Sequence, residues 1–378
     1  MSAGLPRIGV AGIHGHGANH VRAARSLESA GRARLAAVAD PLAGATPVPG
    51  AARFADAAEM IERAELDIVV LSTPIHTHLP LALTALARGR HVLLEKPPTA
   101  TLADFERLTA AAEAAGRSVQ TGFQSLGSQA IGAVRELIAG GAIGTVTRYG
   151  ALGTWLRTEA YWARSAWAGR RSLGGVPVVD GAVTNPLAHA IATAFAIAGA
   201  RTVDDVSGVR LDLYRANAIE ADDTSSLVVG LAGRAPLTAA LSLTAPRRSE
   251  PYIVVHGEAG RIVLWYTLDT VQFDGPGTAP VTSVHPRTGL LDNLVDHVSN
   301  GAALVAPLED AGAFMRVLEA VRTGTDPRPI AAPYARRIDS PDGPHLVVDG
   351  IEHWSRRAVA EGRTFAELGA PWAVAEPR

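Results

Sequence analysis

The sequence predicts an α/β protein that begins with a parallel sheet and continues into a region rich in alternating strands. Two observations support this prediction. Over the first third of the chain, short apolar runs alternate with segments of helical periodicity. From about residue 145 onward, runs of apolar/polar alternation become frequent. With 378 residues, the chain is long enough for two domains of ordinary size.

The first third supplies five candidate strands and the helices between them. Strands are expected at residues 7–12, 35–40, 67–72, 91–94 and 118–121, and helices after the first strand and at about 53–64, 78–88 and 101–115. Apolar strands joined by helices are typical of parallel sheets with right-handed crossovers. Ligands of such sheets bind beyond the carboxyl ends of the strands, so the loops after these runs are the candidate site.

The loop after the first run is rich in glycine and reads Gly12-Ile-His14-Gly15-His-Gly17. A dinucleotide-binding fingerprint has glycines at its first, third and sixth positions, where the chain turns, the pyrophosphate approaches and the helix packs on the strand. Gly12 and Gly17 fit the first and sixth positions, and His14 occupies the third. We expect Gly12, His14, Gly15 and Gly17 to bind a dinucleotide; a plain glycine-rich turn is the alternative.

Asp40 ends the second apolar run. An acid at this position can accept hydrogen bonds from the ribose hydroxyls, and it repels a 2′-phosphate. No arginine follows Asp40 directly. These observations favour NAD over NADP, whereas a cap of a turn or helix is the alternative role for Asp40.

Lys96 is the only lysine among the 35 lysine and arginine residues of the chain. Arginine stays protonated at any working pH, whereas a lysine amine can lose and regain a proton, as a general base must. Lys96 lies in the sequence Glu95-Lys96-Pro97, directly after the fourth apolar run. We therefore expect a catalytic base here; a structural lysine in an arginine-rich chain is the alternative.

The composition argues against several classes of protein. The net charge is −2 and no basic run is present, which argues against nucleic acid as a partner. Cysteine is absent, so disulfides and thiolate metal sites are excluded. No apolar run reaches the roughly 20 residues of a membrane span, and no signal-type segment precedes the first strand. We expect a cytoplasmic protein without a membrane partner.

Four short motifs follow one another along the first domain: Gly12…Gly17-x-x-His20, Val38-Ala-Asp40-Pro41, Ser72-Thr73-Pro74-x-x-x-His78 and Glu95-Lys96-Pro97. In this order and spacing the chain resembles the Gfo/Idh/MocA family of nicotinamide-dependent oxidoreductases, strongly over residues 5–124 and more loosely to the end. The resemblance implies a Rossmann domain that binds NAD, with Thr73, Pro74, His78, Glu95 and Lys96 among its cofactor-binding residues.

For the second domain, the resemblance implies an α+β fold with a large, mostly antiparallel open sheet. Helices would cover one face, and the other face would make the contact of a homodimer or homotetramer. Alternating runs agree at residues 145–155, 205–214, 224–232, 235–244, 252–257 and 260–266, with helices near 289–299, 307–323 and 347–361. The expected domains are 1–124, 125–345 and a C-terminal helix and tail, 346–378, that packs back on the body.

The resemblance also implies the chemistry of Lys96. Family members place this lysine beside the nicotinamide, where it contacts the substrate and takes the alcohol proton. The expected substrate is a secondary alcohol of a sugar, glycoside, cyclitol or related polyol. Two alternatives stay open: tightly held NAD used for transient oxidation in elimination, glycoside cleavage or epimerisation, and a dinucleotide-binding sensor without catalysis.

A second family motif is kept only in part. Asp180 matches the family's aspartate, but Thr184 stands where the family has histidine. Threonine can donate or accept a hydrogen bond but cannot serve as a base near neutral pH. Asp180, Thr184 and His189 are the candidate catalytic residues, and Asn185 is a candidate substrate contact.

The start of the following helix can also be predicted from this segment. We expect Thr184 or Asn185 to cap it, with Pro186 in the first turn, so that Asn185 and His189 share a face.

An aromatic and basic stretch follows the first strand of the second domain. It contains Tyr161, Trp162, Arg164 and Trp167. Flat aromatic faces and guanidinium forks suit carbohydrate or carboxylate substrates, so these four residues are candidate substrate contacts. A packed loop or a subunit contact is the alternative.

Two histidine pairs could in principle bind metal, as in metal-dependent hydrolases. They are His14-x-His16 and His76-x-His78. No acidic cluster lies between the members of either pair, and the nucleotide-binding motifs account for both loops. We expect no metal, and the metal content of the purified protein would test this.

Overall fold

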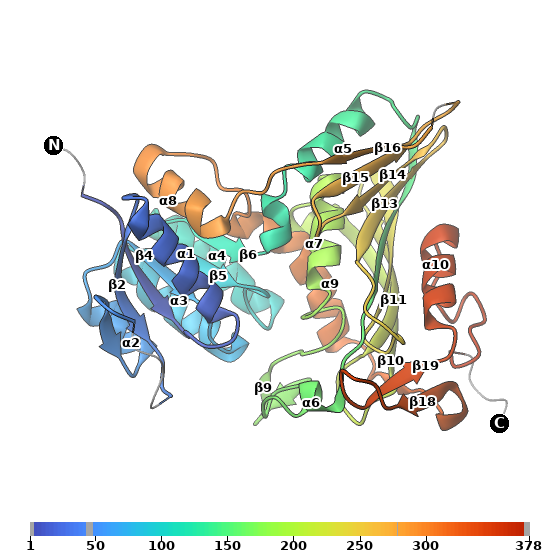
Figure 1. Cartoon of the computed structure of the whole chain (residues 1–378), viewed down its shortest axis with the longest axis horizontal. Coiled ribbons are helices and arrows are strands. Elements are labelled where there is room, and N and C mark those ends of the chain that lie inside the picture. Colours follow the sequence, from blue (N-terminus) through green and yellow to red (C-terminus); the bar gives the residue numbers. More distant parts are fainter. Residues whose placement is uncertain (1–3, 43–47, 278, 374–378) are drawn as a thin grey trace. The chain divides into compact units, whose positions relative to one another are not determined.

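A computed structural model describes residues 4–42, 48–277 and 279–373 of the chain (Figure 1). These residues form two compact units. Unit 1 comprises the described residues of Met1–Gly127 and Thr288–Ala311, and unit 2 comprises those of Ser128–Arg287 and Gly312–Arg378. Residues 288–311 were expected in the second domain, but they belong to unit 1. The C-terminal helix and tail are part of unit 2.

Unit 1 contains a six-stranded parallel sheet. Its strand order is β3-β2-β1-β4-β5-β6, with β1 (Arg7–Ala11), β2 (Arg34–Ala39), β3 (Ala52–Phe54), β4 (Ile68–Leu71), β5 (His91–Glu95) and β6 (Val119–Gly122). This is the doubly wound order of a Rossmann fold. A helix was expected from about residue 53, but the chain first forms the short edge strand β3. Helix α2 (Ala57–Arg63) begins only after Asp56, whose side chain caps it.

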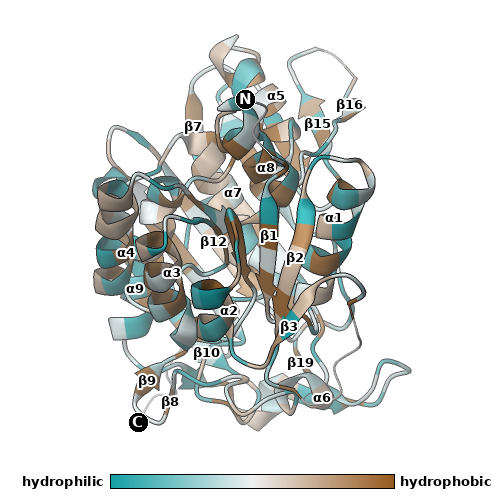
Figure 2. Cartoon of the chain, turned by 90° about the vertical axis from the view of Figure 1, so that its left-hand side faces the viewer, coloured by the Kyte–Doolittle hydropathy of each residue, from teal (hydrophilic) through white to brown (hydrophobic). Residues whose placement is uncertain are grey.

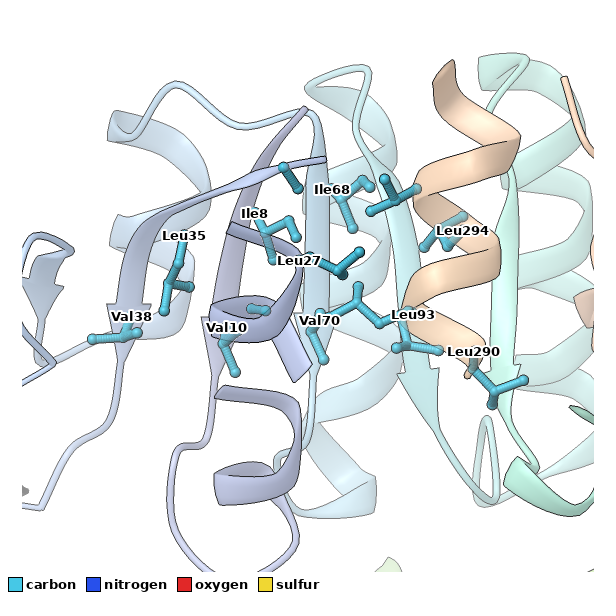
Figure 3. Close-up of a cluster of buried hydrophobic side chains, with 14 of the residues drawn as sticks. Ile8, Val10, Leu27, Leu35, Val38, Ile68, Val70, Leu93, Leu290 and Leu294 are labelled. Carbon is cyan, nitrogen blue, oxygen red and sulfur yellow. The ribbon is translucent and has the colours of Figure 1, made fainter. Parts of the chain in front are cut away.

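Helices cover this sheet and complete the core of unit 1. They are α1 (Gly17–Ser29), α2, α3 (His78–Ala87), α4 (Leu102–Ala115) and α8 (Leu290–Asn300). Helix α1 carries both polar and apolar residues (Figure 2), and it buries Ala24 and Leu27. Figure 3 shows the apolar cluster in which Leu290 and Leu294 of α8 lie among strand residues such as Ile8.

The apolar face of α8 explains why residues 288–311 belong to unit 1. Leu290, Leu291, Leu294 and Val295 are all buried in the unit 1 cluster. Each such side chain contributes about 1.5–3 kcal/mol on burial. The amphipathic pattern of α8 is visible in the sequence, but the surface that it covers is not.

His91 at the start of β5 is held as a neutral imidazole. Its Nδ1 accepts a hydrogen bond from the backbone N–H of Ser118 at 3.1 Å, which a protonated ring could not do. Burial, followed by the positive charges of Arg117 and His297, lowers the pKa of His91 to about 4. In the unfolded chain the pKa returns to about 6.5, so the unfolded state binds the extra proton first as the pH falls.

We expect this histidine to make unit 1 less stable in mild acid. Its contribution is complete above about pH 6.5 and is lost as the pH falls toward about 4. Because the ring is only half-buried, the loss should be about 1–2 kcal/mol rather than the full value of the shift. Urea unfolding at about pH 5 and about pH 7.5 would measure it. The variant His91→Asn keeps an acceptor for Ser118 but does not titrate, so an equal pH dependence in this variant would contradict the assignment.

Unit 2 contains a nine-stranded, mostly antiparallel sheet. Its order is β16-β15-β14-β13-β7-β12-β11-β10-β17, with β7 (Val146–Thr154), β10 (Val206–Arg215), β11 (Thr224–Leu231), β12 (Arg234–Ser242), β13 (Tyr252–Gly257), β14 (Arg261–Trp265), β15 (Thr270–Asp274), β16 (Val281–Val284) and β17 (Arg328–Pro329). Only the pairs β7/β12 and β10/β17 are parallel. Strands β15 and β16 were not expected; they extend the sheet at one edge.

Helices lie on both faces of this sheet, not on one. Helices α5 (Ala130–Ala139), α7 (Ala188–Ala198) and α9 (Gly312–Thr323) lie on one side and α10 (Ile351–Glu361) on the other (Figure 1). Two glycines of β7 show how closely neighbouring segments pack on the sheet. A Cβ on Gly153 would lie 2.7 Å from Leu187, which precedes α7, and a Cβ on Gly150 would lie 2.2 Å from Val359 of α10. Phe365 and Trp372 of the tail join the same cluster as α10.

Short elements complete unit 2. They are α6 (Glu159–Trp162) and two small antiparallel hairpins, β8 (Ser172–Leu173) with β9 (Val176–Pro177) and β18 (Ala335–Ile338) with β19 (His345–Val348). Strand β19 occupies the residues where the last helix was expected to begin. In the described part of the chain, no helix is long and apolar enough to cross a membrane.

Candidate active site

The turn between β1 and α1 requires glycine at two positions. Gly12 has φ +77°, and a Cβ there would lie 2.3 Å from the carbonyl oxygen of Ser72. A Cβ on Gly17 would lie 1.8 Å from the carbonyl oxygen of Gly12. Gly15 also has positive φ, but open space surrounds it. Gly12 and Gly17 therefore serve the tight turn and the close packing of α1, and the open position at Gly15 beside the N-terminus of α1 fits a dinucleotide pyrophosphate.

Asp40 lies at the carboxyl end of β2 and faces this turn. It is 7% exposed, and its two carboxylate oxygens accept hydrogen bonds of 3.0 Å from the backbone N–H groups of Ile13 and Leu42. His14, at the third fingerprint position, places Nε2 3.7 Å from Asp40. The carboxylate is thus fixed in orientation, with acceptor capacity left for ribose hydroxyls.

The loop after β4 is tied to the turn after β5 by His78. Its ring is 2% exposed; Nε2 lies 2.9 Å from the carbonyl oxygen of Thr73, and Nδ1 lies 3.1 Å from that of Pro97. Burial lowers the pKa of His78, although these carbonyls oppose the effect. A neutral ring can donate to only one of these two carbonyl oxygens at a time. The buried ring of His78 thus lies between the two loops, and its expected contact with the cofactor stays a prediction. Thr73 and Pro74 lie in the loop after β4, and their contact with the cofactor stays a prediction.

Glu95 is the centre of a buried hydrogen-bond network at the end of β5. Its Oε1 accepts from His20 Nε2 at 2.8 Å and from Gln124 Nε2 at 2.8 Å, and it lies 3.3 Å from His16 Nε2. Its Oε2 accepts the backbone N–H of Lys96 at 3.2 Å. The carboxylate therefore holds the backbone from which Lys96 projects.

The network keeps Glu95 ionised. Burial by itself would raise the pKa of Glu95, but hydrogen bonds from His16 and His20 and their positive charge hold it well below its usual range. In return, the hydrogen bond to Glu95 raises the pKa of His16, while repulsion from Lys96 opposes this rise. His16, Glu95 and Lys96 are therefore electrostatically coupled.

Lys96 itself is partly exposed, and the Lys96–Pro97 bond is cis. Gly122 of β6 lies against Glu95, since a Cβ there would lie 2.8 Å from the Cα of Glu95. The glycine thus lets the turn pack on the neighbouring strand. The sequence-predicted residues Gly12, His14, Gly17 and Asp40 and the Glu95-Lys96-Pro97 turn all lie at the carboxyl ends of β1, β2 and β5, as expected for an open parallel sheet.

In unit 2, Asp180 is almost fully buried and has strong partners on both oxygens. Oδ2 accepts from Arg164 Nη2 and from the backbone N–H of Gly169, each at 2.8 Å, and Oδ1 accepts from Asn185 Nδ2. The ion pair with Arg164 joins the aromatic and basic stretch to the second family motif. With both oxygens occupied, Asp180 is better placed to orient these partners than to take a proton.

Thr184, a candidate catalytic residue from the sequence, is completely buried and serves the turn itself. Its hydroxyl donates to the carbonyl oxygen of Val179 and accepts the N–H of Gly181. Val179 has φ +47°, which is unusual for a β-branched residue. Because both hydrogen-bonding functions of the hydroxyl are used inside the turn, the assignment of Thr184 to catalysis is corrected to a positioning role.

The helix after this motif starts later than expected. Helix α7 begins at Ala188 with Leu187 at its N-cap, and no side chain caps it. The expected capping roles of Thr184 and Asn185 are therefore wrong, because these side chains bond to Val179 and Asp180 instead. Asn185 and His189 are both partly exposed.

The predicted substrate contacts Tyr161, Arg164 and Trp167 form a stack, whereas Trp162 packs differently. The Arg164 guanidinium lies 3.8 Å from the ring centroid of Tyr161 and 4.6 Å from that of Trp167. Burial raises the pKa of Tyr161, so its hydroxyl stays protonated. Trp162 makes an edge contact with Tyr161 and lies against Gly169, and its Nε1 is buried.

Sequence reasoning missed three residues of the unit 1 network. His20 was visible in the motif Gly17-x-x-His20, and His16 was visible as an unusual side chain inside the glycine turn. Gln124 follows β6 without any sequence signal. The histidine pairs considered as metal ligands are not brought together; among the described residues, the set within 4.8 Å is His16, His20 and Glu95.

These features define a class of protein: one built on a dinucleotide-binding Rossmann domain. Residues 6–123 match the family model described as oxidoreductase family, NAD-binding Rossmann fold, and residues 131–263 match the GFO/IDH/MocA C-terminal domain. The chain belongs to the Gfo/Idh/MocA family of oxidoreductases, and NAD is its cofactor.

Curated relatives match only part of the chain. The chain is 39% identical over 85 residues to dTDP-3,4-didehydro-2,6-dideoxy-alpha-D-glucose 3-reductase of Streptomyces antibioticus, covering 22% of this chain and 26% of the relative. It is 41% identical over 86 residues to inositol 2-dehydrogenase 4 of Saccharopolyspora erythraea, covering 22% and 25%. The chain thus aligns with about a quarter of the length of each of these two relatives.

Among solved structures, the fold is similar to that of the WlbA dehydrogenase from Bordetella pertussis in complex with NADH and UDP-GlcNAcA. The TM-score is 0.70 at 22% identity, and the match covers 84% of this chain and 95% of that one. At this identity the likeness establishes the fold.

Proposed function

We propose that this protein is an NAD-dependent dehydrogenase that oxidises a secondary alcohol of a sugar, glycoside, cyclitol or related polyol. The observation that carries the proposal is the Glu95-Lys96-Pro97 turn at the end of β5 in an NAD-binding Rossmann domain. Glu95 is fixed by His16, His20 and Gln124, and it bonds to the backbone of Lys96. The names of the relatives, a dideoxyglucose reductase and an inositol dehydrogenase, support this class of substrate.

The residues of unit 1 fit NAD. Gly12 and Gly17 allow the tight turn and the close approach of α1 that a dinucleotide-binding turn requires, and Gly15 adds an open position beside them. Asp40 is fixed to receive ribose hydroxyls. When bound, NAD⁺ supplies the acceptor for the hydride of the alcohol carbon.

In the proposed reaction, Lys96 takes the hydroxyl proton of the substrate. Lys96 is the only lysine of the sequence, and an arginine could not replace it as a base because a guanidinium stays protonated. Glu95 acts through Lys96 by holding its backbone. In unit 2, we propose that Asn185 and His189 hold substrate hydroxyls, while Asp180 fixes Asn185 and Arg164.

The direct test is NADH formation from NAD⁺ with a panel of sugars, glycosides and cyclitols. We expect turnover with at least one member, with a ketone as product. Product analysis by mass spectrometry separates net dehydrogenation from transient oxidation, because elimination, cleavage or epimerisation leaves no net NADH. Binding of NADH without any change of substrate across the panel would instead support the sensor alternative.

Asp40 should determine the choice between NAD⁺ and NADP⁺. The variant Asp40→Asn keeps an acceptor for one backbone N–H but removes the negative charge that repels a 2′-phosphate. We expect kcat/KM with NAD⁺ to fall about 10- to 100-fold and the preference over NADP⁺ to shrink accordingly. Initial rates with both cofactors measure this; an unchanged ratio of the two rates would contradict the assignment.

A metal-dependent reaction is the second candidate. One observation favours it: ligand atoms of His16, His20 and Glu95 lie within 4.8 Å of one another. Two histidines and a glutamate are a ligand set known for zinc. Elemental analysis of the purified protein, and activity before and after chelation, would decide between the two candidates, because the dehydrogenase proposal requires no metal.

We also propose that the nine-stranded sheet makes a subunit contact in a homodimer or homotetramer. Helix α10 already covers the sheet over β7 and β12, so the contact would use the other strands. Strand β16 presents Val281 and Val284, which are 59% and 74% exposed. Light scattering would give the oligomeric state, and a monomer would contradict the proposal.

A further inference from the structure

A chain of contacts between guanidinium groups and aromatic rings connects six residues of unit 2. The guanidinium carbon of Arg157 lies over the rings of both Trp155 and Tyr161, 4.8 Å and 4.7 Å from their centroids. Arg164 continues the chain of contacts beyond Tyr161, and Arg248 covers Trp155 at 4.6 Å. We call this set the arginine ladder; in order, it consists of Arg248, Trp155, Arg157, Tyr161, Arg164 and Trp167.

The arginine ladder carries more positive charge than its surroundings neutralise. Arg164 is paired with Asp180 at 2.8 Å. Among the residues that the structure describes, neither Arg157 nor Arg248 has a carboxylate within 4.0 Å. The Nε of Arg157 is buried without a hydrogen-bond partner, whereas its Nη1 donates to the carbonyl oxygen of Leu156 at 3.2 Å and the guanidinium also hydrogen-bonds to the Tyr161 side chain.

Bringing these cations together is costly. Burial, partly offset by Tyr161, lowers the pKa of Arg157, and the charges of Arg248 and Arg164 lower it further. The aromatic rings offset part of the repulsion, because a guanidinium is attracted to the face of a ring. Contacts with both rings and hydrogen bonds to Tyr161 and Leu156 hold the Arg157 guanidinium in place, and the fork of such a group can donate two N–H groups at once to a carboxylate or phosphate.

We propose that the arginine ladder binds the anionic group, carboxylate or phosphate, of an acidic sugar substrate, with Arg157 and Arg248 as specificity-determining residues. The inference deepens the proposed function and rests on it, since the anion is assigned to the molecule that is oxidised. Arg164 connects the arginine ladder to Asp180, and Asp180 in turn bonds to Asn185. The anion site and the proposed hydroxyl-binding residues of unit 2 are thus joined by direct contacts.

Two neighbouring arginines provide a matched pair of variants for the test. Arg248 belongs to the arginine ladder, whereas Arg247 lies outside it, with Nε 3.8 Å from Glu352. Both are exposed, so Arg248→Met and Arg247→Met should fold equally well and remove the same charge. Arg157→Lys is the third variant; it keeps the charge but loses the planar fork.

Binding of D-glucuronate and glucose 6-phosphate is measured by calorimetry at constant ionic strength, with glucose as the uncharged counterpart. We expect at least one acidic sugar to bind more tightly than glucose. Its affinity should fall about 10- to 100-fold in Arg248→Met and Arg157→Lys, but change less than threefold in Arg247→Met. The tighter of the two acidic sugars identifies carboxylate or phosphate as the recognised group.

Two results would overturn the inference. One is that neither acidic sugar binds more tightly than glucose. The other is that Arg247→Met and Arg248→Met weaken binding equally, which would indicate unspecific attraction by net charge. NADH formation is recorded separately with the same sugars. Turnover of glucose without preference for the acidic sugars would contradict the anion site but support the dehydrogenase. Tight binding of an acidic sugar without turnover of any sugar would contradict the dehydrogenase.

Discussion

Replacing Lys96 by methionine is expected to lower kcat for alcohol oxidation by about 10²- to 10⁴-fold, the usual contribution of a general base. No other lysine exists in the chain to take over the proton. The affinity for NADH should change little, because the glycine turn and Asp40 provide separate contacts. Steady-state NADH formation and fluorescence titration with NADH measure the two quantities.

The variant Lys96→Arg separates proton transfer from charge. It restores a cation at the same position, but a guanidinium stays protonated and cannot accept the proton. We expect Lys96→Arg to be as inactive as Lys96→Met. Arg88→Met, which removes an exposed cation from the end of α3, serves as the control and should keep full activity. If Lys96→Arg retains more than about a tenth of the wild-type kcat, Lys96 acts as a charge and the proposed proton transfer is wrong.

Gly17→Ala is expected to disrupt the nucleotide-binding turn. The added Cβ would lie 1.8 Å from the carbonyl oxygen of Gly12, and a backbone atom cannot move aside as a flexible side chain can. Such overpacking costs about 1–3 kcal/mol, and the displaced turn should lower the affinity for NADH by at least about tenfold. Thermal unfolding and NADH titration measure the two effects.

Other glycines provide graded controls for this prediction. Gly15→Ala meets no neighbour within 4 Å but keeps a positive φ, so about 1–2 kcal/mol of backbone strain is expected. Gly132 lies in α5 with open space around it, and Gly132→Ala should be neutral or stabilising. If Gly17→Ala lowered stability and NADH affinity no more than Gly15→Ala does, the proposed reason for glycine at position 17, the close approach of the helix to the turn, would be wrong.

The positions of candidate residues were predictable wherever a residue follows a strand of the parallel sheet. Gly12, Gly17, Asp40 and Lys96 lie beyond the carboxyl ends of such strands, and their roles in binding and catalysis stay predictions. Thr184 was misjudged for a different reason. Its hydroxyl is a suitable polar group, but the structure directs it to the carbonyl oxygen of Val179 inside the protein. Sequence position does not reveal such internal partners.

The arginine ladder shows a different limit. Tyr161, Arg164 and Trp167 were noticed because they are close together in the sequence. Arg248 is far from them in the sequence. It reaches Trp155 because β7, which leads to Trp155, pairs with both β12 and β13, and Arg248 lies in the connection between these two strands. Pairing of distant strands thus adds a cation that no local pattern could indicate.

The sequence by itself determined the Rossmann strands, the glycine turn, the acid after β2 and the single lysine, because these depend on local periodicity and on residue chemistry. Only the tertiary structure decided that α8 completes the core of unit 1, that β15 and β16 extend the second sheet, and that α10 covers its other face. The physical reason is the same in each case. An apolar stripe shows that a segment must be buried, but the free energy of burial is not directional and does not specify the partner.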